Sequence, residues 1–232
     1  MDDKSIKETV LEELKKLAGL SWRQRIGYIW DYYKPLMVAI IVIIACISIG
    51  VTIYHNLQIN HIFQAYLINS SNYSLDTDQM SAEFSDFIGG IGKNDEITID
   101  ATMTYDENDN TQYGMASQMK LVTFAAAGEI DVMIGDEALY DHYIHSGGMT
   151  DLTDLLTEEE LKAWDDYLVW GVDEEDGTKA AYAMKLNDSP VLQRYQAYTM
   201  GDSYVMLPLS GQHPDMSRKF LKYLMGEGEN NE

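Results

Sequence analysis

The stretch Pro35–Tyr54 reads PLMVAIIVIIACISIGVTIY and contains no charged residue. In an α-helix with a rise of about 1.5 Å per residue, such a stretch extends roughly 30 Å, the thickness of the hydrocarbon core of a bilayer. A core helix of a soluble protein normally keeps a polar face, and this stretch has none. The sequence therefore predicts a transmembrane helix over residues 35–55.

Basic residues are unevenly distributed on the two sides of this stretch. Residues 1–34 contain seven Lys and Arg residues, and the next basic residue after the stretch is Lys93. Lys and Arg concentrate on the cytoplasmic side of a span, and Trp and Tyr concentrate at its two interfaces. The aromatic residues that satisfy this second rule are Trp22, Tyr28, Trp30, Tyr32, Tyr33 and Tyr54. We expect a single-pass protein of the cell membrane, with a cytoplasmic N-terminus and an extracellular C-terminal domain.

The charge of the C-terminal part limits its partners. Residues 56–232 contain 9 basic and 32 acidic residues, a net charge of 9 − 32 = −23. Such a domain repels the phosphate groups of nucleic acids and of anionic lipids. We therefore expect no nucleic-acid partner, and an outer domain that stands off the lipid bilayer, which the chain contacts through residues 35–55.

Cys46 is the one cysteine of the chain, so a disulfide bond within the chain is excluded. The residues 43–46 loosely resemble the cleavage site of a bacterial lipoprotein. In a lipoprotein signal the apolar stretch ends at the cysteine, whereas here it continues to Tyr54. An uncleaved helical anchor is favoured over lipidation of Cys46.

The two ends of the chain are expected to be appendages. Residues 4–18 have apolar residues at helical spacing, which predicts a short amphipathic helix, and Trp22–Tyr33 is expected to follow the inner leaflet into the span. The segment 1–34 is either a membrane collar or a small contact surface. The polar tail 226–232 has nothing to bury and is predicted to be disordered.

Residues 56–225 alternate between strand and helix patterns, which predicts an α/β domain. The expected strands start near residues 62, 96, 130, 167, 179 and 204, and the acidic run 173–177 predicts a hairpin between two of them. The sheet is therefore expected to be mixed. One predicted helix carries Met115, Met119, Val122 and Ala126 at helical spacing, and we expect this stripe to face the core.

No motif indicates catalysis, a cofactor or a metal. Asp106, Asn108 and Asn110 match the first ligand positions of a calcium loop, but Thr111 and Ser117 replace its essential Gly and Glu. His142 and His145 are spaced like an edge of a zinc site, without further Cys or His nearby. No phosphate loop, dinucleotide fingerprint or nucleophile with an adjacent base is present. We expect a protein that is not an enzyme.

Three segments carry a resemblance to a known family. Residues 119–156 (MKLVTFAAAGEIDVMIGDEALYDHYIHSGGMTDLTDLL), 176–186 (DGTKAAYAMKL) and 203–225 (SYVMLPLSGQHPDMSRKFLKYLM) resemble extracellular solute-binding proteins of the type II periplasmic-binding fold. Only residues 187–203 separate the last two strands, so the domain looks like one lobe of that fold. Residues 21–36 (SWRQRIGYIWDYYKPL) resemble a widespread group of uncharacterised single-pass membrane proteins of Gram-positive anaerobes.

The resemblance implies a membrane-tethered, non-catalytic module that binds a small molecule or peptide. The alternative is an envelope sensor or protein-interaction subunit that kept the fold, lost the pocket and docks another membrane protein. Ligands of open α/β sheets bind beyond the carboxyl ends of the strands. The residues nominated by this rule as ligand-binding, with two aromatic walls, are Asn69, Ser70, Ser71, Asp136, Asn187, Asp188, Ser189, Trp170 and Tyr182. An ordinary role in caps and loops stays open for each of them.

Overall fold

The computed structural model describes residues 21–144, 147–172, 177 and 179–227. The chain divides into two units, Met1–Gln58 and Ile59–Glu232. The predictions for the helix 4–18, the hairpin turn 173–176, His145 and the tail beyond residue 227 lie outside the described residues.

The first unit is described from Ser21 and contains the helix α2 (Trp22–Asn56). Its segment Lys34–His55 is long and apolar enough to cross a membrane, and none of it is buried by the chain. Among the polar side chains of this segment, Thr52 donates a hydrogen bond from Oγ1 to the carbonyl oxygen of Ser48, 3.0 Å away. This bond satisfies the hydroxyl within the helix itself, as a hydrocarbon environment would require.

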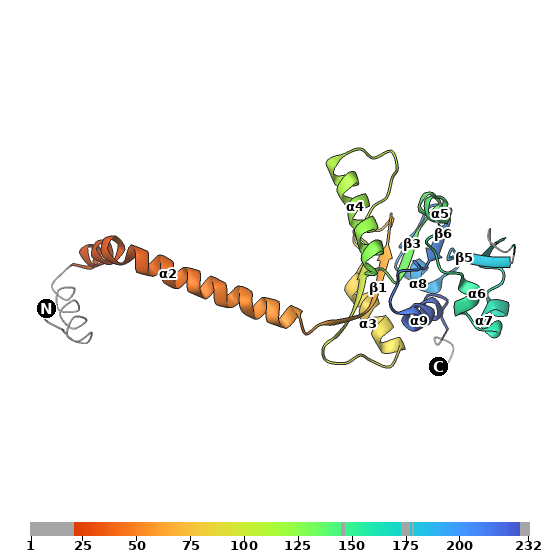
Figure 1. Ribbon diagram of the computed structural model, residues 1–232, viewed down its shortest axis with the longest axis horizontal. Helices are drawn as coiled ribbons and strands as arrows, with labels where there is room; N and C mark the ends of the chain where they lie inside the picture. Colours follow the sequence, from red (N-terminus) through yellow and green to blue (C-terminus); the bar gives the residue numbers. More distant parts are fainter. Residues whose placement is uncertain (1–20, 145–146, 173–176, 178, 228–232) are drawn as a thin grey trace. The chain divides into compact units, whose positions relative to one another are not determined.

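The second unit is built on a six-stranded sheet with the order β2-β1-β3-β6-β5-β4 (Figure 1). The strands are β1 (Asn60–Leu67), β2 (Asp95–Asp100), β3 (Val132–Asp136), β4 (Leu168–Val172), β5 (Lys179–Lys185) and β6 (Ser203–Met206). β1 pairs in parallel with β2 and β3, whereas β6 is antiparallel to β3 and β5, and β4 is antiparallel to β5. The prediction of a mixed α/β sheet is confirmed.

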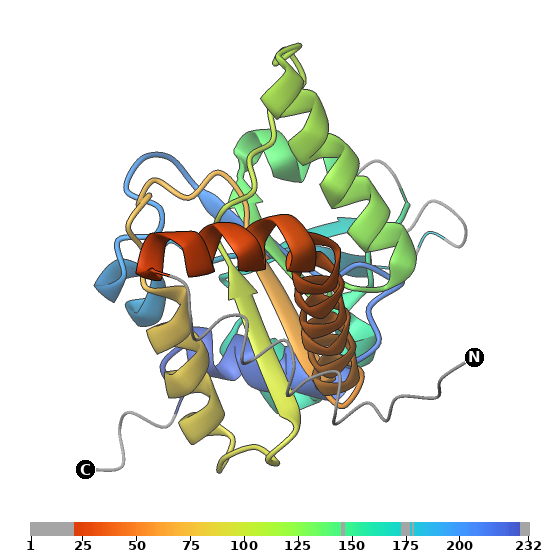
Figure 2. The ribbon, with the colours of Figure 1, turned by 90° about the vertical axis from the view of Figure 1, so that its left-hand side faces the viewer.

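Helices cover both faces of the sheet (Figures 1 and 2). They are α3 (Thr77–Phe87), α4 (Gln112–Ala127), α5 (Glu137–Ile144), α6 (Leu152–Leu155), α7 (Glu158–Ala163), α8 (Pro190–Arg194) and α9 (Pro214–Leu224). Successive residues of a strand point to opposite faces. In β1, accordingly, Phe63, Ala65 and Leu67 belong to one core cluster and Tyr66 to another. The first cluster lies under α3, α8 and α9, and the second lies under α4 and α5.

The centre of the first cluster is a group of three aromatic rings. Phe63, Phe84 and Phe220 are fully buried, and their ring centroids lie 4.9 to 5.1 Å apart. Aromatic pairs at this distance add stability beyond their buried area. This contact joins β1, α3 and α9, three elements that are far apart in the sequence.

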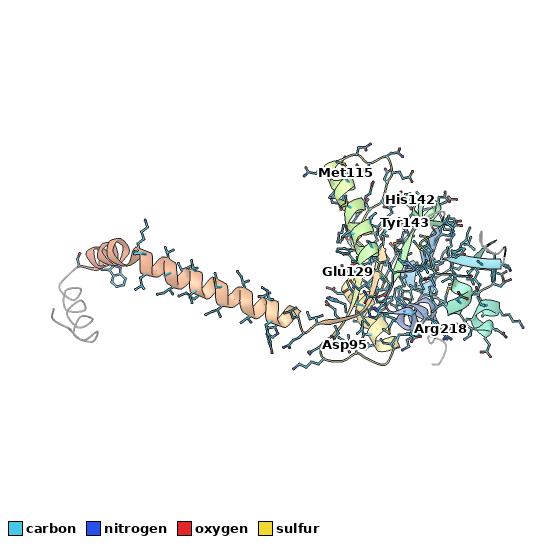
Figure 3. All side chains as sticks on the ribbon, viewed as in Figure 1. Asp95, Met115, Glu129, His142, Tyr143 and Arg218 are labelled. Carbon is cyan, nitrogen blue, oxygen red and sulfur yellow. The ribbon has the colours of Figure 1, made fainter. Side chains whose placement is uncertain are left out.

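The orientation predicted for α4 is wrong. Met115, Met119 and Val122 are 54%, 67% and 57% exposed, and Ala126 is also exposed, whereas Gly114, Ser117 and Leu121 face the sheet. The two ends of α4 lie near Met115 and Glu129, both labelled in Figure 3. The side of α4 that faces the sheet is set by the hydroxyl of Ser117. It donates a hydrogen bond to the carbonyl oxygen of Thr104 at 2.7 Å and accepts one from the N–H of Thr104 at 3.0 Å.

The helices α7 and α8 each begin with a side-chain cap. Thr157 and Glu160 form a capping box at the start of α7, and Ser189 accepts a hydrogen bond from Leu192 N at the start of α8. The last strand, β6, ends at Met206, and Pro208 beyond it makes only an isolated bridge to Met149.

Candidate ligand-binding pocket

Asn69 and Asp136 follow the neighbouring parallel strands β1 and β3, and their side chains meet. Asn69 Nδ2 donates a hydrogen bond to Asp136 Oδ2 at 3.0 Å. The Asn69 amide also bonds the backbone of Tyr105 at 2.8 Å in both directions, accepting from its N–H and donating to its carbonyl oxygen. Asn69 has φ 59°, a left-handed conformation that Asn tolerates better than most residues. This side chain therefore anchors the segment after β2 to the end of β1.

Asp136 also fixes the start of α5. Its Oδ1 accepts a hydrogen bond from Leu139 N at 3.1 Å, which satisfies one of the free N–H groups of the first helical turn. Gly135 permits this tight turn, because a Cβ atom there would lie 2.3 Å from Leu139 Cδ2. The carboxylate of Asp136 is thus held by two donors.

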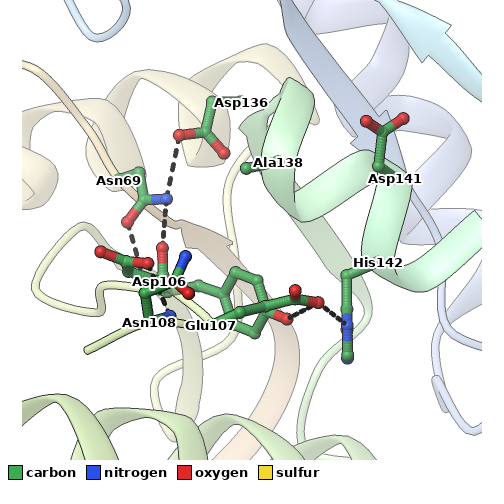
Figure 4. Close-up of a pocket in the computed structure, with 9 residues that line it drawn as sticks. Asn69, Asp106, Glu107, Asn108, Asp136, Ala138, Asp141 and His142 are labelled. Atoms are coloured by element: carbon green, nitrogen blue, oxygen red, sulfur yellow. Dashed lines mark hydrogen bonds and ion pairs between the residues drawn. The ribbon is translucent and has the colours of Figure 1, made fainter. Parts of the chain in front are cut away.

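These groups border an open pocket of about 630 Å³ (Figure 4). Its lining consists of Asn69, Tyr105, Asp106, Glu107, Asn108, Asp136, Ala138, Asp141 and His142. Figure 4 shows Asp106 near Asn69, the side chain of Glu107 reaching to His142, and Asp141 projecting from α5 away from the other carboxylates. The lining includes four carboxylates and neither Lys nor Arg.

One wall of the pocket is a hydrogen-bonded chain of three side chains. Tyr105 donates its hydroxyl to Glu107 Oε1 at 3.1 Å, and the same oxygen lies 2.8 Å from His142 Nδ1. The hydrogen bond with His142, followed by that with Tyr105, lowers the pKa of Glu107 below its usual range. Burial, followed by the bond to Glu107, raises the pKa of Tyr105. Glu107 is therefore an anion and Tyr105 a neutral donor at neutral pH.

Ser70 and Ser71 lie beside the pocket and not in its lining. Ser70 Oγ and Ser71 N both donate to the carbonyl oxygen of Ala197, at 2.9 and 2.7 Å. Next to them, the buried hydroxyl of Tyr198 lies 2.8 and 2.9 Å from the carbonyl oxygens of Ile68 and Ile134. The connection between β5 and β6 thus covers this part of the strand ends, and both serines hold it in place.

The nominated residues after β5 also have structural contacts. Asn187 Oδ1 accepts from Ser203 N at 3.0 Å and fixes the start of β6, while Asp188 is exposed. Ser189 is fully buried and donates its hydroxyl to Leu224 O at 2.6 Å. None of the three lines the pocket.

Trp170 and Tyr182 lie on opposite faces of the sheet. Trp170 pairs with Ala181, so the next residue along β5, Tyr182, points to the other face. Trp170 packs against the first core cluster and donates from Nε1 to Asp165 at 2.9 Å, whereas Tyr182 packs against the second cluster. They do not form two walls of one site.

Sequence reasoning did not nominate Tyr105, Glu107, Asp141 or His142 as ligand-binding residues. For Tyr105 and Glu107, the sequence does contain a signal, because they lie in the acidic run that follows β2. Since β2 pairs in parallel with β1, the carboxyl ends of the two strands lie side by side. The sequence pattern around Asp106 and Asn108 indicates a calcium loop only in part and does not nominate them for an organic ligand. Within the described residues, no group of three or more His, Cys, Asp or Glu side chains is placed to hold a metal ion.

Comparisons of the chain with protein-family models, with curated proteins and with solved structures give no match.

Proposed function

We propose that this chain is a single-pass membrane protein with a cytoplasmic N-terminus and an outer, non-catalytic, solute-binding-like domain that takes a small organic cation. The observation that carries the proposal is the pocket at the carboxyl ends of β1 and β3, lined by four carboxylates without Lys or Arg. The charge-free stretch Pro35–Tyr54 and the basic residues before it support the membrane topology.

The charge of the pocket selects the ligand class. Asp106 and Glu107 are exposed, and Asp136 is half-buried beside them. A unit positive charge about 4 Å from a carboxylate gains roughly 1 kcal/mol in water and more where the pocket wall excludes solvent. For an anionic ligand, the interaction with each carboxylate would be unfavourable by a similar free energy. Amines, guanidines and basic peptides therefore fit better than sugars or acids.

The domain binds with one lobe. Between β5 and β6 the connection contains only the five-residue helix α8 as regular structure. Without a second lobe to close over the pocket, a ligand stays partly solvated and gives up less surface to the protein. Since the affinity of a small ligand depends on buried contacts, we expect binding in the micromolar to millimolar range, about −8 to −4 kcal/mol.

A thermal-shift screen of the full-length protein in detergent tests the ligand class. We expect diamines, spermidine, arginine and lysine-containing peptides to raise the melting temperature, and neutral sugars and acidic amino acids to leave it unchanged. The double variant Asp106→Asn/Glu107→Gln should lose the shift. The matched control Glu159→Gln/Asp166→Asn removes the same charge at exposed positions outside the pocket and should keep it. Equal shifts in both double variants would contradict the proposal.

Cysteine labelling in intact cells tests the topology. In a Cys46→Ser background, a cysteine in place of Tyr73, which is 98% exposed, should react with a membrane-impermeant maleimide. A cysteine in place of Ser5 should react only after the membrane is permeabilised. The reverse pattern would refute the proposed orientation, and release of the protein by high-salt washing would refute the anchor.

A specific observation favours a second candidate, a protein-interaction subunit. It is the exposed apolar face of α4, which no described element of its own unit covers and which a pocket-based function does not require.

A further inference from the structure

The exposed apolar face of α4 consists of Met115, Met119, Val122 and Ala126. Spacings of three and four residues place these side chains in one row along the helix. Three of them are more than half exposed, while the buried side of α4 contains the small residues Gly114 and Ser117. Single exposed apolar residues are common on protein surfaces, but a continuous row of them marks an interaction site.

This row lies on a surface that differs in charge from the rest of its unit. The unit from Ile59 onward contains 9 basic and 32 acidic residues, yet α4 contains no Asp or Glu. Its one charged residue, Lys120, is turned toward Asp100 at 3.8 Å and lies 5.2 Å from the ring centroid of Phe124. The row itself is therefore neutral and apolar.

The charge distribution decides between the partners of such a row. An anionic membrane surface repels the acidic unit as a whole. A basic protein would be attracted to carboxylates elsewhere and gains nothing from a row that has none. Two copies of this unit repel each other through most of their surfaces, and α4 offers them a contact without facing carboxylates. We propose that α4 is the contact between two copies of this chain.

The size of the contact agrees with a pair that forms in a membrane. Stable interfaces between soluble proteins bury about 1,000 Å² or more in total, and a contact made by one 16-residue helix of each copy is small beside them. The anchor proposed above confines both copies to one membrane, which raises their effective concentration, so a contact too weak for free domains suffices. The contact is isologous, and Met119, in the middle of the row, lies nearest the two-fold axis whether the helices run parallel or antiparallel.

Disulfide crosslinking in native membranes tests this contact. In full-length protein with Cys46→Ser, oxidation of Met119→Cys should give a product of twice the chain mass, because Cys residues on a two-fold axis reach the required Cα distance of about 4.4–6.8 Å. The matched control is Met200→Cys, which is 82% exposed and lies outside α4. It should remain monomeric under the same conditions.

A charge substitution provides the second measurement. Met119→Glu places two carboxylates at the axis and should weaken self-association of the full-length protein in reconstituted lipid vesicles at least tenfold, with an unchanged melting temperature because the side chain is exposed. Met200→Glu should leave self-association unchanged. Equal crosslinking of the two cysteine variants would overturn the proposal, as would a photo-crosslinker at position 119 that reacts with lipid or with a different protein. Failure of the cation screen would leave this result unaffected, because Met119 is not part of the pocket.

Discussion

Replacing Asp131 with Ala is expected to lower the free energy of unfolding by about 4 kcal/mol. Asp131 is nearly inaccessible and accepts hydrogen bonds from the backbone N–H groups of Gln64, Gln212 and His213, at 2.8 to 2.9 Å. Its Oδ2 also lies 3.0 Å from His213 Nδ1. One carboxylate thus joins β1, the start of β3 and the start of α9, and Ala would leave three backbone donors without an acceptor.

Urea unfolding of the full-length protein in detergent, followed by tryptophan fluorescence, measures this effect. Asp131→Asn should lower the free energy of unfolding by less, about 2 kcal/mol. The amide keeps one oxygen that can accept hydrogen bonds, but its NH₂ group faces a backbone N–H that also needs an acceptor. The control Asp188→Ala removes an exposed carboxylate and should change stability by less than about 0.5 kcal/mol. A similar small change for Asp131→Ala would show that the buried carboxylate does not organise these three elements.

Acidification should remove the contribution of Glu160. Its carboxylate is buried. The Nε–H of Arg218 is shared between its two oxygens at 2.9 and 3.0 Å, Arg218 Nη2 donates to Oε1 at 2.9 Å, and Lys222 Nζ lies 2.8 Å away. Burial by itself would raise the pKa of this group, but the bonds from Arg218, Lys222 and Thr157 outweigh burial and lower the pKa to about 2. A carboxyl group whose pKa is lowered on folding stabilises the protein above its unfolded pKa.

The stabilisation by Glu160 is therefore complete above about pH 5 and is lost as the pH falls toward 2. At pH 7, Glu160→Gln should lower the free energy of unfolding by about 2 kcal/mol, which allows for solvent around the partly exposed Arg218 and Lys222. Gln can keep the capping box of α7, so the difference reports the ion pairs. Unfolding of both proteins across this pH range should show the difference shrinking to nothing. If the difference in unfolding free energy between the two proteins stayed constant with pH, the effect of the substitution would come from packing and not from the ion pairs.

Much of the fold could be predicted from local patterns. The charge-free stretch after Lys34 indicated the long apolar helix, and the alternation of Ile97 and Ile99 indicated β2, where both are buried. Caps such as those at Thr157 and Ser189 are also local, because a cap depends on side chains within three residues.

The features that local patterns did not predict depend on contacts between residues that are distant in the sequence. Ser70 looked like a residue at a strand end facing a ligand, yet its partner is Ala197, 127 residues away. The orientation of α4 is set by the bond of Ser117 to Thr104, in an irregular segment whose position no periodicity reports. The rule of strand ends nominates Asn69 and Asp136, both of which line the pocket, and Glu107, which also lines it, follows β2, a parallel strand to which the same rule applies.

The most direct test of the central claim is calorimetric titration of the full-length protein in detergent with spermidine. We expect one site per chain, binding that weakens as salt rises, and at least tenfold weaker binding by Asp106→Asn/Glu107→Gln. The control Glu159→Gln/Asp166→Asn should bind like the unmodified protein. Equal affinity in both double variants, or no binding of spermidine at low salt, would contradict a cation-binding pocket at the ends of β1 and β3.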